Sequence, residues 1–316
     1  MKKILVTGGA GYIGSVVVKK LVDAGYSVTV VDDLSRGRKE NVDSRAVFHK
    51  VNILNFTSFE KNLKNKAFDV LMHFAARKDV GESMERPDLY DENIKGMMNL
   101  LEIAPRLKIK QFIFSSSAAV YGEPKVKKIN EAHECNPANF YGFTKLMGED
   151  LLKWHADLSG MRYVALRYFN VAGYEGLNYI GPNVRNIFNV IADVLFGNKK
   201  QLEIFGNDYD TVDGTGVRDY VHVSDIADAH IKAMNLKGSG VFNLGSEKGY
   251  SVLEIMNMFE KVSGKKVKYR FIKKRLGDLT SVVASFDKAK KILNWQPKFG
   301  LLEMVESTLK AYNKKR

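Results

Sequence analysis

Short, uninterrupted runs of hydrophobic residues recur along the first half of the chain, and glycine or polar residues close each of them. Runs of this length and composition are typical of strands that are buried on both faces of a parallel sheet. They predict six strands, at residues 3–7, 27–32, 46–51, 68–75, 111–117 and 162–169.

Between these runs, hydrophobic residues recur at helical spacing. They predict helices at residues 12–24, 56–63, 88–105 and 140–158, with Gly25 and Pro105 ending the first and the third. Strict alternation of strand and helix predicts an α/β fold with a parallel sheet covered by helices on both faces. Because crossovers between parallel strands are right-handed, we expect a doubly wound, Rossmann-type sheet.

The pattern changes after about residue 170, where loops rich in Gly, Asn and Asp become longer. Helical periodicity returns at residues 185–196, 224–236, 251–263 and 302–312, with short strands between. We therefore expect a sheet domain at residues 1–170 and a smaller α/β substrate-binding region at 171–316, and leave open that some C-terminal segments return to the first domain. Ligands bind beyond the carboxyl ends of parallel strands, so the second region should wall a substrate cleft there.

Composition narrows the class of protein. The chain has 316 residues, 45% of them hydrophobic and 27% charged, as in ordinary globular proteins. Its net charge is +13, but the lysines are spread along the chain, so we interpret them as a solvated surface rather than a nucleic-acid site. A single cysteine, Cys135, excludes an intramolecular disulfide and a cysteine-built zinc site, and we expect no metal. No hydrophobic run is long enough to span a membrane, so a cytoplasmic protein is expected.

A glycine-rich segment, TGGAGYIG, follows the first predicted strand and opens the first helix. Gly8, Gly11 and Gly14 allow a tight turn, close approach of the backbone to a pyrophosphate, and close packing of helix on strand. The helix N-terminus then faces the anion. Asp32, at the end of the second strand, would accept hydrogen bonds from ribose hydroxyls and repel a 2′-phosphate, which favours NAD over NADP. Arg36 and Arg38 are interpreted as exposed loop charges.

A second pattern indicates hydride chemistry at the carboxyl edge of the sheet. The fifth strand ends at Ser115–Ser117, and Tyr141 opens a later helix with Lys145 one turn on. Abstraction of a hydroxyl proton needs a base, and tyrosine, with a pKa of about 10, is a poor one. A nearby ammonium and a positive nicotinamide ring favour the phenolate. We therefore predict Ser117, Tyr141 and Lys145 as the catalytic set.

With its glycine loop and YxxxK motif, the sequence resembles the extended short-chain dehydrogenase/reductase superfamily. Five segments resemble the UDP-glucose (UDP-galactose) 4-epimerases within it, at residues 74–83, 114–125, 167–173, 204–230 and 242–254. The resemblance spans nearly the whole chain, and residues 204–230 are the most specific part. It implies an isomerase of galactose metabolism with tightly bound NAD. Tyr141 would serve as acid and base. A transient 4-keto sugar would rotate to present its other face before the hydride returns.

The resemblance also implies binding residues. The cofactor would lie against Gly8, Gly11, Tyr12, Ile13, Gly14, Asp32, Asp33, Asn52, Ile53, Phe74, Ala75, Ala76, Lys78, Asn93, Ser115, Tyr141, Lys145 and Phe169. The UDP-sugar would contact Lys78, Ser117, Tyr141, Asn170, Asn186, Ile187, Phe205, Arg218, Arg275, Asp278 and Val282. Within this set, the two asparagines would hold the diphosphate and uracil end, both arginines would pair with the diphosphate, and Asp278 would bind ribose hydroxyls.

Four positions depart from the family pattern. Asn52 stands where the family usually has Asp, and Ala119 where many epimerases have Thr. The loop between Asn170 and Asn186 is short and lacks the usual acidic stretch. Val282 occupies a position that is Tyr in some members, and a small residue there could admit an N-acetyl group. UDP-N-acetylglucosamine therefore stays open as an alternative substrate.

Three other functions need features that the sequence lacks or would leave the Ser–Tyr–Lys set unexplained. A 4,6-dehydratase would need an acid after Ser117, where Ala118 and Ala119 stand. A UDP-glucuronate epimerase or decarboxylase would need a cation for the sugar carboxylate. A non-enzymatic NAD-binding or RNA-binding relative would not need the Ser–Tyr–Lys set. The family resemblance also implies a homodimer, formed by the helices at 88–105 and 140–158.

Overall fold

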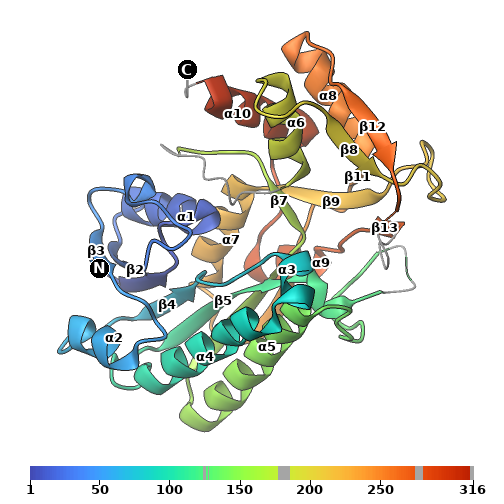
Figure 1. The fold of residues 1–316 in the computed structure, drawn as a ribbon. Helices are drawn as coiled ribbons and strands as arrows, with labels where there is room; N and C mark the ends of the chain where they lie inside the picture. The colour runs from blue at the N-terminus through green and yellow to red at the C-terminus, as the bar shows by residue number, and fades with distance from the viewer. Residues whose placement is uncertain (124–125, 127, 177–185, 275–279, 314–316) are drawn as a thin grey trace.

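Seven parallel strands form the main sheet, in the spatial order β10-β6-β5-β4-β1-β2-β3 (Figure 1). Our computed structural model describes residues 1–316 except 124–125, 127, 177–185, 275–279 and 314–316. The strands are β1 (Lys3–Thr7), β2 (Ser27–Asp32), β3 (Val47–Lys50), β4 (Val70–His73), β5 (Gln111–Ser117), β6 (Arg162–Tyr168) and β10 (Gly240–Leu244). The order reverses between β1 and β4, so their carboxyl ends open the crevice in which doubly wound folds bind ligands.

Helices cover both faces of this sheet, because every inner strand carries hydrophobic residues on both sides. On one face lie α1 (Tyr12–Asp23), α7 (Val223–Ala233) and α9 (Asp287–Leu293), packed on Ile4, Val6, Val30 and Ile113. On the other lie α2 (Phe56–Leu63), α4 (Pro87–Ile103) and α5 (Phe140–Ser159), packed on Leu5, Leu71, Phe112 and Phe114. The predicted doubly wound α/β fold is confirmed.

A smaller unit lies beyond the carboxyl ends of the strands, at the top of Figure 1. Its helices are α6 (Ile187–Leu195), α8 (Val252–Ser263) and α10 (Leu301–Asn313), which share a third hydrophobic core. Its strands are β7 (Asn170–Ala172), β8 (Leu202–Phe205), β9 (Val217–His222), β11 (Gly249–Ser251), β12 (Tyr269–Ile272) and β13 (Ser281–Val282). β12 pairs with β8, and β9 pairs with β7, β11 and β13. This unit overhangs the crevice.

The second half of the chain is divided between the two units. β10 closes the main sheet beside β6, and α7 packs on α1, although both lie beyond residue 170. The short helix α3 (Val80–Glu85) and the 3-10 turns η1 (Lys39–Asn41) and η2 (Ala118–Tyr121) complete the elements. α3 and α9 are absent from the sequence prediction, because a helix of six or seven residues shows barely two turns of periodicity.

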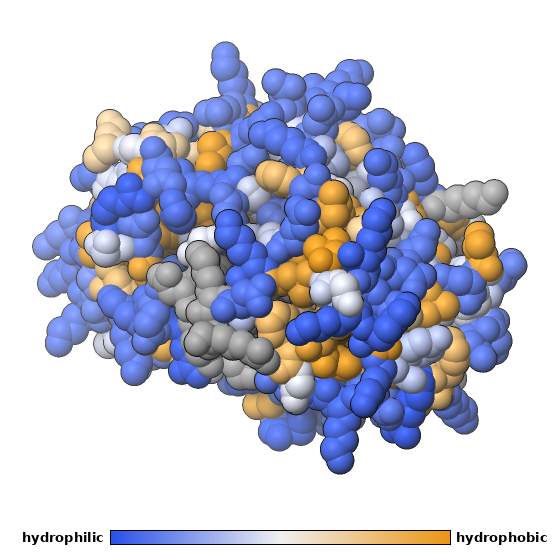
Figure 2. Space-filling model, turned by 90° about the horizontal axis from the view of Figure 1, so that it is seen from above, coloured by the Kyte–Doolittle hydropathy of each residue, from blue (hydrophilic) through white to orange (hydrophobic). Residues whose placement is uncertain are grey.

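The surface seen from above is mostly hydrophilic, with hydrophobic side chains gathered near the middle of that face (Figure 2). Among the described residues, no helix is both long and apolar enough to cross a membrane.

Candidate active site

The glycine-rich loop forms the wall of a cavity of about 380 Å³ at the carboxyl ends of β1, β2 and β4. Gly8 has a φ of +76°, and a Cβ there would lie 2.4 Å from the Ala75 nitrogen. At Gly14 a Cβ would lie 2.3 Å from the Gly8 carbonyl oxygen. α1 begins directly after this loop, and no acidic residue occupies its first turn. Because the glycines have no side chains, a pyrophosphate can approach the backbone of the turn and the N-terminus of α1.

Asp32 ends β2 beside this loop, with its side chain almost completely buried. Its two carboxylate oxygens accept hydrogen bonds from the backbone N–H groups of Ala10 (3.0 Å) and Leu34 (2.9 Å). Burial raises the pKa of this carboxyl, and these backbone donors act in the opposite direction. Each oxygen keeps acceptor capacity for a ribose hydroxyl, so the cavity can hold the adenosine half of a dinucleotide.

The sequence predicts Arg36 to be an exposed loop charge, but the structure shows it half-buried and paired. Its guanidinium lies 3.0 Å from a carboxylate oxygen of Glu82 on α3, and the residue lines the cavity. The sequence could not reveal this pair, because its members are 46 residues apart. Arg38 is exposed, as expected, although it too lines this cavity.

Most of the predicted cofactor residues line this same cavity. They are Gly8, Gly11, Tyr12, Ile13, Gly14, Asp32, Asp33, Asn52, Ile53, Phe74, Ala75, Ala76, Lys78, Asn93 and Ser115. The Asn93 side chain bonds the backbone N–H and carbonyl of Arg77 (2.8 and 3.1 Å) and the Thr144 hydroxyl (3.1 Å). It thereby fixes the loop after β4 against α5. Glycine cradle, carboxylate and helix N-terminus together fit NAD.

Ser117 and Tyr141 line a second, larger cavity of about 1230 Å³, which shares several lining residues with the first. The Ser117 hydroxyl lies near enough to the Tyr141 phenol to lower its pKa. Tyr141 opens α5, whose N-cap Asn139 accepts from the Gly142 N–H (2.8 Å), and the Tyr141 N–H donates to Ser83 of α3 (3.1 Å). Lys145, one turn later, is buried and donates to the Ser115 carbonyl (2.8 Å). Its nitrogen lies 5.9 Å from the Tyr141 ring centroid. The structure thus brings the predicted set together.

Burial dominates the electrostatics of this set. It raises the pKa of the Tyr141 phenol, while the Ser117 hydroxyl lowers it. Burial also lowers the pKa of Lys145 to about 7, while the Glu149 carboxylate raises it. The influences on the Tyr141 pKa are thus burial and Ser117, and stabilisation of the phenolate by Lys145 stays a prediction. With a pKa of about 7, the Lys145 side chain changes its charge close to neutral pH.

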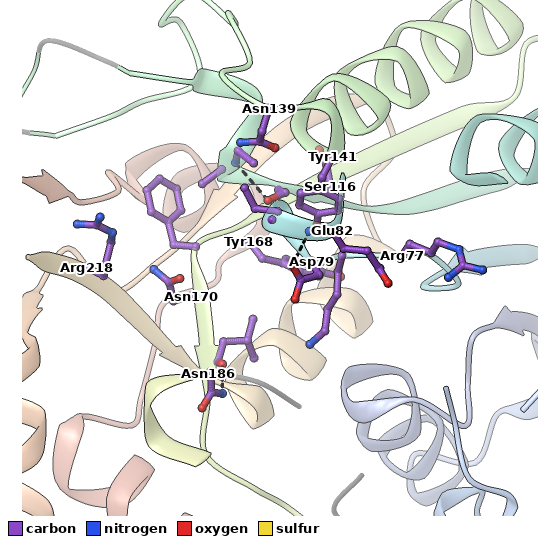
Figure 3. A pocket seen from close by; sticks show the side chains of 18 of the residues that line it. Arg77, Asp79, Glu82, Ser116, Asn139, Tyr141, Tyr168, Asn170, Asn186 and Arg218 are labelled. Carbon is purple, nitrogen blue, oxygen red and sulfur yellow. Dashed lines mark hydrogen bonds between the residues drawn. The ribbon is translucent and has the colours of Figure 1, made fainter. Parts of the chain in front are cut away.

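The larger cavity lies between the main sheet and the smaller unit (Figure 3). Of the predicted substrate and cofactor residues, it is lined by Tyr12, Ile13, Lys78, Ser117, Tyr141, Phe169, Asn170, Asn186, Arg218 and Val282. Asn170, Asn186 and Arg218 lie together on one side of Tyr141 in Figure 3. Ala118 and Ala119 also line it, with no carboxylate at those positions.

Some predicted residues have other roles or places. The Asn186 side chain caps α6 by accepting from the Asn189 N–H (3.0 Å), and it donates to the Val171 carbonyl (3.1 Å). Neither Ile187 nor Phe205 lines either cavity in the described part of the chain, which departs from the prediction. Ile187 instead packs at the edge of the core of the smaller unit. Arg275 and Asp278 lie outside the described residues.

Several residues of the site are missing from the sequence prediction. Asp79 and Glu82 of the α3 region and Tyr168 at the end of β6 line the larger cavity. Ser116 lines it too and bonds the buried Glu149. Asn139 directly before the helix carries an N-cap signature that could have been read. Within the described residues, no group of three or more His, Cys, Asp and Glu could hold a metal ion.

Comparison with known proteins agrees with this geometry. The model of the NAD dependent epimerase/dehydratase family matches residues 4–245. The UDP-glucose 4-epimerase of Lactobacillus helveticus is 43% identical, over 99% of this chain and 97% of its own. That of Bacillus subtilis is 42% identical, over 95% and 94%. A crystal structure of the Stenotrophomonas maltophila enzyme, with bound NAD and formylated UDP-arabinopyranose, superposes with a TM-score of 0.95 at 34% identity, over 100% and 99%. The chain belongs to the NAD dependent epimerase/dehydratase family.

Proposed function

We propose that this chain is a UDP-glucose 4-epimerase, an isomerase that uses NAD to interconvert UDP-galactose and UDP-glucose. The observation that carries the proposal is that Ser117 and Tyr141 lie together in the larger cavity, which shares part of its lining with the cofactor cavity. Seven residues line both cavities: Tyr12, Ile13, Ser35, Arg36, Arg77, Lys78 and Tyr168. A dinucleotide in one and a nucleotide sugar in the other would thus present their reacting ends to Tyr141.

Side chains of this chain transfer the proton of the sugar 4-hydroxyl. The Tyr141 phenolate takes the proton of the sugar 4-hydroxyl and returns it after the sugar has turned. The Ser117 hydroxyl holds the same oxygen while it is a carbonyl. Bound NAD supplies the acceptor for the hydride of C4 and, at the other face, its donor. Because the hydride returns to the sugar, no net oxidation occurs and the cofactor has no need to leave.

The larger cavity supports the turning of the sugar. Its volume of about 1230 Å³ exceeds that of ordinary small-molecule sites. We assign Asn170, Asn186 and Arg218 to the UDP part, away from Tyr141, so that the diphosphate stays anchored while the hexose rotates. A guanidinium suits phosphate oxygens because its planar fork donates two parallel hydrogen bonds.

The first test is to incubate the purified protein with UDP-galactose, without added cofactor, and to measure UDP-glucose. Conversion is expected, and Tyr141→Phe should lower kcat by about 10²- to 10⁴-fold, because it removes the acid/base. Tyr269→Phe, which changes an exposed tyrosine of β12, should leave kcat unchanged. If no UDP-glucose appears even after NAD is added, the proposal is wrong.

We further propose a cytoplasmic homodimer. A single, half-buried cysteine suits a reducing compartment. α4 and α5 pack together on the outside of the sheet and expose Met98, Phe143, Trp154 and Leu158. An apolar surface of this kind on a paired helix face favours association with a second copy.

A further inference from the structure

Three charged side chains are buried beneath the carboxyl end of β5, and the proton chemistry above uses only one of them. Lys145 and Glu149 of α5 and Arg167 of β6 are 4%, 5% and 5% exposed. Burying a charge is costly unless it is paired and hydrogen-bonded. The three therefore have to be explained together.

Glu149 connects α5 to the strand end that carries Ser117. Its carboxylate accepts two parallel hydrogen bonds from Arg167, from Nε (2.9 Å) and Nη2 (2.6 Å), and a third from the Ser116 hydroxyl. Ser116 and Arg167 are direct partners in the register of β5 and β6. The residue that precedes Ser117 is thus held to α5, the helix that carries Tyr141 in its first turn.

The same carboxylate acts on Lys145, one helical turn before it. Lys145 faces the Tyr141 ring on its own helix, the Phe114 ring (4.8 Å) and the Ser115 carbonyl of β5, and His73 of β4. Burial favours the neutral amine and Glu149 favours the ammonium, leaving the pKa of Lys145 at about 7. His73 is buried and its pKa is lowered to about 3, first by burial and then by Lys145, so it stays uncharged near neutral pH.

We propose that Glu149 is a positioning residue of the active site. It holds the Ser117 strand end against the helix of Tyr141, and its carboxylate, one helical turn from Lys145, favours the ammonium form of that side chain. The proposal deepens the proposed function and rests on it, because the catalytic value of both effects depends on Ser117, Tyr141 and Lys145 acting as assigned. Arg167 allows the carboxylate to stay charged while buried.

The test compares Glu149→Gln with Glu149→Asp and with Glu102→Gln, which removes an exposed carboxylate of α4. The readout is an NMR pH titration of Lys145 in protein labelled with isotopic lysine, with the signal assigned by its loss in Lys145→Met. Glu149→Gln should lower the titration midpoint by about one pH unit, a tenfold smaller ammonium-to-amine ratio. Glu149→Asp should restore most of it, and Glu102→Gln should leave it unchanged.

Activity provides the second readout. The alkaline limb of the kcat profile should shift with the Lys145 midpoint in Glu149→Gln. Ser116→Ala, which keeps the charge and removes only the tether, should lower kcat at an unchanged Lys145 midpoint. Far-UV circular dichroism shows whether each variant is folded.

An unchanged Lys145 midpoint in folded Glu149→Gln would refute the charge role, and full kcat in Ser116→Ala would refute the tether. If the unaltered protein does not epimerise UDP-galactose, the proposed function fails. The titration then still decides whether Glu149 controls the Lys145 charge.

Discussion

At the scale of single residues, Arg36 shows how a charge beside the cofactor cavity can form an ion pair with a distant part of the chain. It lines both cavities and pairs with Glu82, and the buried Tyr90 hydroxyl donates to the same carboxylate (2.9 Å). The pair joins the loop after β2 to α3. A 2′-phosphate would have to compete with Glu82 for Arg36, so the pair reinforces the choice of NAD that Asp32 makes.

Breaking this pair should loosen the hold on the cofactor. We expect Glu82→Gln to raise the rate of NAD release about two- to fivefold at low salt, because a partly exposed ion pair contributes up to about 1 kcal/mol. The difference should shrink at high salt, where the pair is screened. Release can be measured by diluting the protein into an NAD-consuming trap.

Asp88→Asn is the matched control, because it breaks the exposed Arg86–Asp88 pair at the start of α4 instead. Equal release rates for Glu82→Gln and the unaltered protein at low salt would show that the pair does not retain the cofactor.

At the scale of elements, α7 is stabilised in a way that depends on pH. Asp225 in its first turn is fully buried and accepts from the Phe299 N–H (3.2 Å), while its other oxygen has no hydrogen-bond partner in the described part of the chain. Burial raises its pKa to about 6. The folded chain therefore holds a proton at pH values where the unfolded chain has lost it.

The sign of the effect follows from proton linkage. Between about pH 4 and pH 6 the folded state binds more protons at Asp225, so this residue's contribution to stability falls as pH rises, and it is constant above. We expect Asp225→Asn to reduce the loss of unfolding free energy across this range by on the order of 1 kcal/mol. Thermal melts at several pH values measure it.

Asp23→Asn should have the opposite effect on the slope. Hydrogen bonds from Lys19 and Arg45 lower the pKa of Asp23, so its contribution is lost as pH falls. A slope that is unchanged in Asp225→Asn would contradict the assignment.

Elements also mark the limit of what the sequence predicts. The six strands and four helices predicted for the first half fall within two residues of prediction, because each has a clear hydrophobic pattern with glycine, proline or polar residues at its ends. The Gly-rich loop and the Ser–Tyr–Lys set could be placed from the sequence because each lies on or beside such an element, and their roles stay predictions. Glu149 was missed, because its importance depends on Arg167, and only the register of β5 and β6 brings Arg167 opposite Ser116. Whether Ile187 and Phe205 line a cavity depends on how the elements of the smaller unit are arranged, and the local sequence pattern does not specify that arrangement.

At the scale of the whole molecule, one surface supports the proposed dimer, because it exposes several large apolar side chains. On α5, Phe143, Trp154 and Leu158 are 42%, 69% and 82% exposed, and their spacing of eleven and four residues places them on one helix face. Met98 of the adjacent α4 is 54% exposed. A two-fold axis through this face would bury these side chains of both subunits.

The homodimer can therefore be tested with one charge. Trp154→Glu places a carboxylate at the centre of the face, and the pair of such charges across the axis should separate the subunits. Light scattering should give twice the 35.6 kDa chain mass for the unaltered protein and a single chain mass for the variant. Tyr269→Glu, at an exposed aromatic of the smaller unit, should remain dimeric. A single chain mass for the unaltered protein at every concentration would refute the dimer. Because Tyr141 lies at the opposite end of α5 from Trp154, a monomeric variant that keeps its kcat would also establish that each subunit holds a complete site.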